Sequence, residues 1–417
     1  MLKSGTYAIL LLFTTLLSGQ TFEIIPPEYI KTIQLLSSEN EFNGTPIIRL
    51  GTGFTLSFDD VRASEEDYYY VIEHFDYDWT PSKLSKNEFL EGFDNQRIFD
   101  YTNSFNTLQS YSHYELQIPN QNIRAITMSG NYMLKILNYN GDVVFSRKFI
   151  VYENLAKVPA EVRRSRDLNY IREKQVIYFS VESENLIFRN PNQTTNAVII
   201  QNNDLNEAIY GLKPQYTSGN NLIYRYDNQA AFWGGNEYRF FDNSDIRLAT
   251  QGIQRIELGQ DLYNTYLNTH YPRKGEKYIF NPDINGGFRI NSQQGQDLRR
   301  EAEYAWVHFK LKEDVKNNGG EFHLYGRFNN YALNDNTHLM YNEESGLYET
   351  KLLLKQGFYN FKYVYLTPEG NLDTGYVSGN YDVTENEYTI LIYYRDIGGR
   401  FDRLIGVGSA NSRNIIN

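Results

Sequence analysis

The sequence predicts an all-β protein built from tandem immunoglobulin- or fibronectin-like β-sandwich domains. Aromatic residues make up 15% of its 417 residues, including 36 Tyr and 25 Phe, and such side chains suit a pleated, half-buried sheet surface. Short runs alternate between apolar and polar residues with a period of two, and no amphipathic helix interrupts them. The length corresponds to roughly three domains.

Residues 1–20 have the pattern of a cleavable secretory signal peptide. Lys3 supplies a positive charge, residues 8–17 are apolar, and Ser18-Gly-Gln20 places small residues near a cleavage point. An uncleaved anchor is the alternative, but the apolar run is shorter than the ~18 residues that a spanning helix needs. The chain has no cysteine, which excludes disulfides, thiolate metal sites, a cysteine nucleophile and a lipidated cysteine. We therefore expect an exported chain that depends on buried cores.

A first domain is expected over residues 21–152. Its strands are expected at residues 30–36, 47–50, 54–58, 68–75, 114–118, 132–137 and 143–152. Clean alternation places Phe54, Leu56 and Phe58 on one face, and Asp59-Asp60 is expected to end that strand. Asn140-Gly141 predicts a hairpin with a type I′ turn, which needs positive φ at both central residues.

Two further domains are expected over residues 153–298 and 299–417. The second has strands expected at residues 176–181, 197–201, 222–226, 237–241 and 253–258, and Asn285-Gly-Gly287 predicts a hairpin between residues 278–280 and 288–290. The third has strands expected at residues 303–311, 322–328, 347–354, 358–365 and 388–395. A turn with positive φ at Gly357 is expected between two of these. The basic stretch at 162–168 is expected to link the first two domains.

Composition and motifs argue against several function classes. A net charge of -11 disfavours a nucleic-acid partner, because phosphate binding needs a basic surface. No nucleophile elbow or phosphate-binding loop is present. The histidines have no metal-ligand spacing, so ordinary strand histidines are expected at His74, His113, His270, His308, His323 and His338. We expect no enzyme, no catalytic or metal site and no cofactor, although paired hydrolase carboxylates cannot be judged from sequence.

Aromatic side chains beside acidic ones are the candidate binding residues. Asp76 and Asp78 flank Tyr77 and precede Trp79. Alternating carboxylates can bind calcium, but the further spaced oxygens of a calcium loop are missing. A turn capped by aspartate, with Trp79 packed or presented to a partner, is favoured over a calcium site. Asn334-Asp-Asn336 has the same two interpretations, a calcium site or a capped turn. Abundant Tyr favours a binding protein, because Tyr buries a large area with few rotors.

The first domain resembles the N-terminal domain of the type IX secretion system plug proteins of Bacteroidota. The matching phrases are Tyr68-Tyr-Tyr-Val-Ile-Glu-His74, Asp76-Tyr-Asp-Trp-Thr-Pro-Ser82, Glu91-Gly-Phe-Asp94, Ser104-Phe-Asn-Thr-Leu108, Tyr111-Ser-His-Tyr114, Ile118-Pro-Asn120 and Ser129-Gly-Asn-Tyr132. Tyr393-Tyr-Arg-Asp396 and Arg400-Phe-Asp-Arg-Leu-Ile-Gly406 resemble the family's C-terminal end. The resemblance implies a non-catalytic periplasmic subunit that closes the outer-membrane translocon barrel (SprA, or Sov) when no cargo occupies the pore, with no transmembrane segment of its own.

The third domain also resembles the early-set sandwiches of glycogen-binding modules. Gly326-Arg-Phe-Asn329 and Gly357-Phe-Tyr359 carry this resemblance. Those modules usually place a sugar-stacking Trp after the Phe-Asn pair, whereas this chain has Tyr331. A glycan-binding protein of the periplasm or cell surface is therefore the alternative function. The candidate partner-binding residues are Asp76, Asp78, Trp79 and Tyr331.

Overall fold

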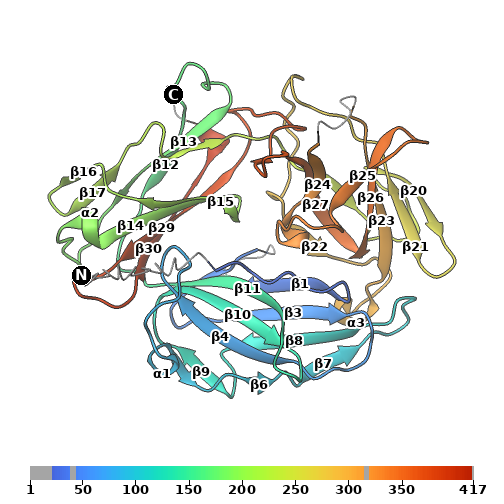
Figure 1. The fold of residues 1–417 in the computed structure, drawn as a ribbon, viewed down its shortest axis with the longest axis horizontal. Coiled ribbons are helices and arrows are strands. Elements are labelled where there is room, and N and C mark those ends of the chain that lie inside the picture. Colours follow the sequence, from blue (N-terminus) through green and yellow to red (C-terminus); the bar gives the residue numbers. More distant parts are fainter. Residues whose placement is uncertain (1–20, 38–43, 314–318, 416–417) are drawn as a thin grey trace, which may run out of the picture.

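The computed structural model describes residues 21–37, 44–313 and 319–415, which form three β-sandwich units (Figure 1). Unit 1 lies at the bottom of this view, unit 2 at the upper left and unit 3 at the upper right. The predicted all-β class is confirmed, and the predicted signal peptide lies outside the described residues. Each helical element among the described residues is a single turn: α1 (Lys86–Phe89), α2 (Pro191–Thr194), α3 (Leu298–Glu301), η1 (Arg327–Asn329) and η2 (Ser412–Asn414). Within the described ranges, no helix is long and apolar enough to cross a membrane.

Unit 1 contains two main sheets and a two-stranded ribbon. One sheet has the order β1 (Ile30–Ser37), β3 (Phe54–Asp60), β8 (Ser112–Ile118), β7 (Asp100–Asn103). The other has the order β2 (Ile47–Arg49), β11 (Val143–Tyr152), β10 (Gly130–Leu137), β4 (Tyr69–Phe75), β6 (Gln96–Arg97). The ribbon pairs β5 (Leu90–Gly92) with β9 (Ile123–Ile126). Its core is strongly aromatic, since Phe58 stacks on Tyr114 with centroids 5.1 Å apart.

Strand β3 confirms the predicted alternation but extends further than expected. Phe54, Leu56 and Phe58 all lie in the core of unit 1. The prediction that Asp59-Asp60 ends the strand is wrong, because β3 includes both residues and both are buried. Asp60 keeps its place in the sheet because it pairs with Arg62 at 2.7 Å and accepts from Tyr68 Oη at 2.8 Å.

Unit 2 is a sandwich of two sheets whose strands come from separate parts of the chain. One sheet has the order β12 (Ala160–Arg164), β13 (Lys174–Val181), β17 (Asn221–Tyr224), β16 (Tyr216–Ser218), with β18 (Ala231–Trp233) also on β13. The other has the order β15 (Asp204–Leu212), β14 (Thr195–Gln201), β29 (Glu387–Tyr394), β30 (Arg403–Asn411). Strand β14 pairs antiparallel with β29 from Thr195↔Tyr394 to Gln201↔Tyr388.

Unit 3 is one long sheet folded over an aromatic core. Its order is β19 (Arg239–Asp242), β27 (Gly357–Leu366), β24 (Glu321–Tyr325), β25 (His338–Asn342), β26 (Leu347–Lys355), β23 (Tyr304–Leu311), β21 (Tyr263–Leu267), β20 (Ile253–Leu258). Two short strands, β22 (Phe288–Ile290) and β28 (Leu372–Asp373), also pair with β27. Phe241, Phe309 and Phe361 pack together at its centre.

The strand pairing differs from the expected division at residues 153–298 and 299–417. Strands β29 and β30 complete a sheet of unit 2, whereas β19 to β22, expected in the second domain, belong to unit 3. Unit 3 is therefore an insertion between β18 and β29 of unit 2. The reason is that sheet pairing is decided by contacts between distant segments, which a local pattern does not encode.

Three turn predictions are also corrected. The Asn140-Gly141 hairpin joins β10 and β11, but of the two residues only Gly141 has positive φ (86°), because a bulge near Leu137 shifts the register. The Asn285-Gly-Gly287 hairpin is wrong, since β22 pairs with β27 and residues 278–280 form no strand. Gly357 does not take positive φ. A Cβ there would lie 2.2 Å from the carbonyl oxygen of Arg289, so glycine is needed for close contact with β22.

Candidate functional site

The contacts between the units contain three of the four predicted site residues, and we call these contacts seams. Seam 1–2 is apolar at its centre. Trp79, which is 1% exposed, and Met133 of unit 1 pack against Ile200 and Tyr393 of unit 2 in one buried cluster. The Nζ atom of Lys148 lies 4.3 Å from the centroid of the Trp79 ring. Since this cluster joins two sandwiches face to face, it holds them as one body.

A charged network borders the apolar centre of seam 1–2. Arg395 binds Asp402 through two bonds of 2.8 Å and reaches Asp76 at 2.7 Å. The Asp402 amide donates to Asp76 Oδ1 at 3.0 Å, and Tyr393 Oη donates to Asn131 Oδ1 at 2.6 Å. Burial and the nearby Asp402 carboxylate raise the pKa of Asp76. The phrases that resemble the plug proteins at the two ends of the chain therefore meet at this seam.

Seam 1–3 contains a cluster of buried charged and polar groups. The Asp59 carboxylate, which is fully buried, accepts from Tyr304 Oη at 2.6 Å and from Lys355 Nζ at 2.8 Å. His113 Nδ1 lies 2.6 Å from the same carboxylate. Burial alone would raise the pKa of Asp59, but Lys355 and His113 hold it below its ordinary value. The cluster is thus an ion pair shared between two units.

The loop after β7 adds further contacts across seam 1–3. The Phe105 amide donates to the carbonyl oxygen of Arg300 at 2.8 Å, and the Gln109 amide donates to Glu303 Oε1 at 3.1 Å. Tyr111 Oη donates to the carbonyl oxygen of Ala302 at 2.9 Å. This loop carries another of the phrases that resemble the plug proteins. In space, it lies beside α3 and the start of β23.

Seam 2–3 contains Tyr331, the fourth predicted site residue. Its hydroxyl donates to the carbonyl oxygen of Asn202 at 3.1 Å, and its ring lies 4.8 Å from that of Tyr325. Tyr325 Oη donates to Asp204 Oδ2 at 2.6 Å. Burial and the Glu207 charge raise the pKa of Asp204 to about 7. An acid buried at this seam is therefore neutral over part of the neutral pH range.

Replacing Asp204 by Asn is expected to change how stability depends on pH. A carboxyl whose pKa is raised by folding stabilises the protein below its unfolded pKa, and this stabilisation is lost as pH rises through about 7. Relative to the native chain, Asp204→Asn should therefore gain about 1–2 kcal/mol in unfolding free energy between pH 5.5 and pH 8.5. Urea denaturation at both values tests this. Asp100→Asn, at an exposed site, should show no such gain, and equal behaviour of the two variants would contradict the prediction.

The predicted site residues make their contacts within the chain. Asp76, Trp79 and Tyr331 are at most 9% exposed and lie in seams. Asp78 caps its turn by accepting from Thr80 Oγ1 at 2.6 Å. That these residues bind another protein stays a prediction. Tyr331 contacts Asn202 in seam 2–3, whereas Asp76 and Trp79 lie in seam 1–2.

The predicted histidines form hydrogen bonds or stack on one another. His74 lies between Ser82 Oγ and the carbonyl oxygen of Ser129, and burial lowers its pKa to about 4. It lies on β4, in a different sheet from His113 on β8. His338 stacks on His323 with centroids 5.2 Å apart. Among the described residues, no group of three or more His, Cys, Asp or Glu could hold a metal ion.

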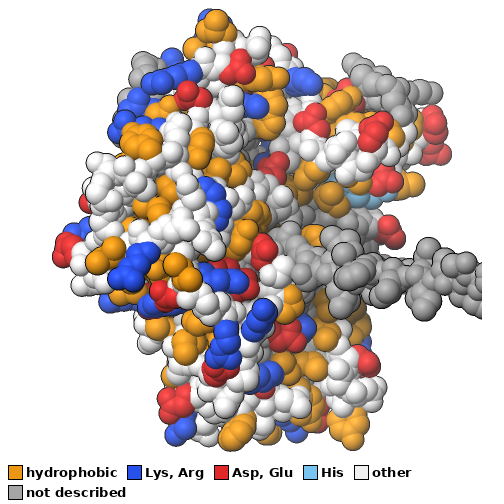
Figure 2. Space-filling view, turned by 60° about the vertical axis from the view of Figure 1, so that its left-hand side comes forward, with side chains coloured by type: hydrophobic (Ala, Val, Ile, Leu, Met, Phe, Trp, Pro, Cys, Tyr) orange, Lys and Arg blue, Asp and Glu red, His pale blue; other side chains and the backbone are white. Residues whose placement is uncertain are grey.

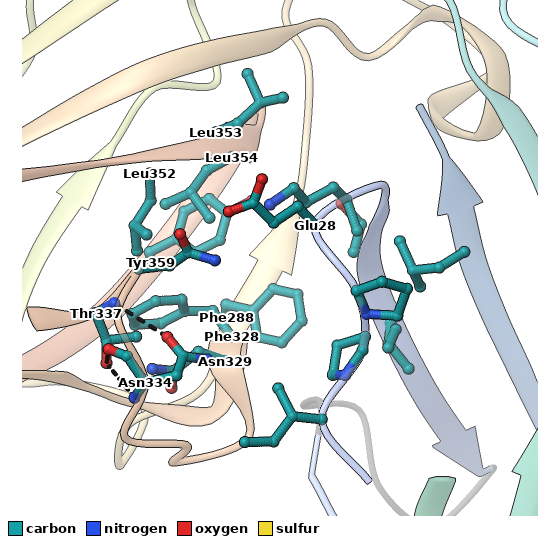
Figure 3. Close-up of a pocket in the computed structure, with 18 of the residues that line it drawn as sticks. Glu28, Phe288, Phe328, Asn329, Asn334, Thr337, Leu352, Leu353, Leu354 and Tyr359 are labelled. Atoms are coloured by element: carbon teal, nitrogen blue, oxygen red, sulfur yellow. Dashed lines mark hydrogen bonds between the residues drawn. The ribbon is translucent and has the colours of Figure 1, made fainter. Parts of the chain in front are cut away.

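A small pocket lies between the Pro26-Pro27 segment of unit 1 and unit 3 (Figure 3). Its volume is about 110 Å³, and Phe288, Phe328 and Leu352 form part of its apolar wall. Asn329 beside them donates to the backbone carbonyls of Leu324 in β24 and of Ala332. Because a cavity of about 150 Å³ holds a benzene ring, this pocket has room for no more than one small apolar group. It belongs to seam 1–3.

Comparisons with known proteins agree with the resemblance of the first domain. A family model described as Type 9 secretion system plug protein 1st domain matches residues 30–153. The crystal structure of a hypothetical protein from Parabacteroides merdae is 31% identical, with a TM-score of 0.89, and covers 94% of this chain and 99% of that chain. No curated protein matches.

Two other solved structures are similar at a much lower level. Dimeric latent PorU from Porphyromonas gingivalis is 15% identical over 49% of this chain and 16% of that chain, with a TM-score of 0.16. Extracellular domains 3–5 of Drosophila OTK are 10% identical over 93% of this chain and 98% of that chain, with a TM-score of 0.15. Neither alignment supports an argument about this chain.

Proposed function

We propose that this chain, which belongs to the type IX secretion system plug protein family, closes the outer-membrane translocon barrel (SprA, or Sov) from the periplasm when no cargo occupies the pore. It is exported through a signal peptide, binds the barrel by protein–protein contact and performs no catalysis. The family match supports the association with type IX secretion, and closure of the pore is our proposal.

The locked seams support this proposal. A plug must present a large surface whose shape does not change, because complementarity rather than area alone gives stable binding. Seam 1–2 is closed by an apolar cluster and seam 1–3 by a buried ion pair. The three sandwiches therefore act as one rigid block. This block presents a larger surface than any one unit would present alone.

The glycan-binding alternative is not proposed for this chain. It needs Tyr331 to offer its ring to a sugar, but that ring is 5% exposed and packs on Tyr325. Stacking on a sugar face requires an accessible aromatic face, so the resemblance to glycogen-binding modules is expected to concern the fold alone.

Removal of the chain is expected to open the cargo-free barrel. Purified barrel in a planar bilayer should conduct when alone and should lose most of its conductance when the purified mature chain is added on the periplasmic side. Cells without the chain should become permeable to large polar solutes, and cells that lack both chain and barrel should not. Unchanged permeability in cells that contain the cargo-free barrel would contradict the proposal.

A further inference from the structure

Two loops on units 2 and 3 present large apolar side chains to solvent. The first is residues 165–173, between β12 and β13, and the second is residues 268–287, between β21 and β22. Leu168 in the first loop is 84% exposed, and Ile279 and Phe280 in the second are 75% and 55% exposed. Single exposed apolar residues are common, but three such side chains on two loops need an explanation.

Hydrogen bonds hold the second loop in place. The Arg273 amide donates to the carbonyl oxygen of Val377 at 2.8 Å. Tyr381 Oη contacts the carbonyl oxygen of Glu276 at 2.7 Å, and the hydroxyl of Tyr278 donates to Glu237. The residues that precede Ile279 are thus held in place, and Ile279 and Phe280 follow them as an exposed apolar tip.

The first loop is also held by specific contacts. The Tyr170 amide donates to the carbonyl oxygen of Asp167 at 3.0 Å. The Nζ atom of Lys174 lies 4.3 Å from the Tyr170 ring centroid and 4.2 Å from that of Trp233. Leu168 therefore projects from a turn whose base is packed on unit 2.

The two loops border the same cleft. Arg172 and Glu173 of the first loop line it together with residues 274–278 of the second, and its volume is about 710 Å³. No residue of unit 1 is among those lining it, so the loops lie on a face of units 2 and 3 that unit 1 leaves uncovered. Figure 2 shows apolar and Lys or Arg side chains side by side over the upper part of the molecule.

These loops lack the excess of acidic residues that the whole chain has. Residues 165–173 contain two basic and two acidic residues, and residues 268–287 contain three basic and two acidic residues, whereas the chain has a net charge of -11. Arg164 is partly neutralised by Asp382 at 2.8 Å. Lys274 and Lys277 are exposed beside Ile279. Basic residues beside projecting apolar ones favour an anionic lipid surface.

We infer that these two loops dock the protein on a phospholipid layer with anionic headgroups. Leu168, Ile279 and Phe280 would enter the boundary between headgroups and acyl chains, while the lysine stems keep their charges at the phosphates. The loop tips project separately, which suits a deformable lipid surface better than a flat protein face. Because pure lipid vesicles contain no barrel, this inference can fail without affecting the proposed plug function.

Flotation with lipid vesicles tests the inference on the purified mature chain. Vesicles of phosphatidylethanolamine and phosphatidylglycerol in a 3:1 ratio should carry the native chain, and phosphatidylcholine vesicles should carry much less. Ile279→Ser with Phe280→Ser should lower binding at least about tenfold, because two large apolar side chains are lost. Lys274→Glu with Lys277→Glu should lower binding to the anionic vesicles alone. Phe93→Ser, at an 80% exposed site of unit 1, is the matched control and should bind normally.

Two further measurements separate the possible outcomes. Brominated lipids should quench Trp233, which is 40% exposed beside the loops, while thermal melts verify that each variant is folded. Equal loss of binding in Phe93→Ser, or no binding of the native chain to anionic vesicles, would overturn the inference. Loop variants that bind vesicles normally but fail to bind the barrel would show a protein-binding surface instead, and would also overturn it.

Discussion

Replacing Asp59 by Asn is expected to cost about 3–5 kcal/mol of unfolding free energy, because it leaves the Lys355 ammonium buried without its counter-charge. Lys355 is 2% exposed and Asp59 is fully buried, so water does not compensate. The Tyr304 hydroxyl also loses a charged acceptor that lies 2.6 Å away. Since these partners lie in different units, the loss should loosen seam 1–3. Urea denaturation measures the stability.

Distances between the units measure the loosening directly. The chain has no cysteine, so spin labels can be attached at Tyr139→Cys of unit 1 and Leu258→Cys of unit 3, both exposed sites. Asp59→Asn should broaden the distance distribution between them. Asp60→Asn is the matched control, because Asp60 is equally buried but is bonded within unit 1 to Arg62 and Tyr68, and it should leave that distribution narrow.

A second variant separates the buried charge from general damage to the seam. Lys355→Met in the Asp59→Asn background removes the unpaired ammonium and should recover most of the lost stability, since apolar replacements of buried ion pairs are often neutral. If the double variant loses as much unfolding free energy as Asp59→Asn and Lys355→Met lose together, the unpaired Lys355 ammonium is not the cause of the instability of Asp59→Asn. The depressed pKa of Asp59 also predicts that the native seam keeps this stabilisation above pH about 4 and loses it as pH falls through the folded pKa.

The local patterns predicted single strands well but not their partners. Alternation at residues 54–58 identified the core face of β3 because a strand has a period of two whatever surrounds it. Strand β29 was also expected as a strand, yet nothing local shows that its Tyr394 pairs with Thr195. The insertion of unit 3 therefore follows from pairing across about 200 residues, which depends on the complete fold.

The same limit applies to the site residues. Trp79 and Tyr331 were predicted as contacts to a partner, and a seam between units of one chain has the same chemistry as an interface between proteins. Asp59 was missed because Asp59-Asp60 after an apolar run resembles a strand end. The period-two pattern of β3 places Asp59 on the face of the sheet opposite Phe58. The sequence does not show that Lys355 covers that face.

Replacing Trp79 by Ala is expected to destabilise the chain by about 3–5 kcal/mol, because a large buried ring is lost and the seam can close only partly over the cavity. The ring is 1% exposed and contacts both units through the apolar cluster, and the Lys148 ammonium above it would lose its aromatic partner. Calorimetry and urea denaturation would measure the loss. Trp306→Ala is the matched control, since Trp306 also packs under a lysine, Lys351, at 4.7 Å, but is half-buried on unit 3. An equal loss in both variants would show that seam 1–2 adds nothing.

The backbone at Trp79 provides a way to separate the ring from the turn. Its φ is 63°, in the left-handed region, where a residue with a Cβ is disfavoured by roughly 1–2 kcal/mol and glycine is not. Trp79→Gly should therefore be less destabilising than Trp79→Ala by up to about 1 kcal/mol, although it removes more atoms. Both variants should still lose most of the stability supplied by seam 1–2, because the ring fills the cluster between the units. If Trp79→Gly instead restored native stability, relief of the strained turn would have to offset the whole packing loss, and the ring could not be what holds units 1 and 2 together.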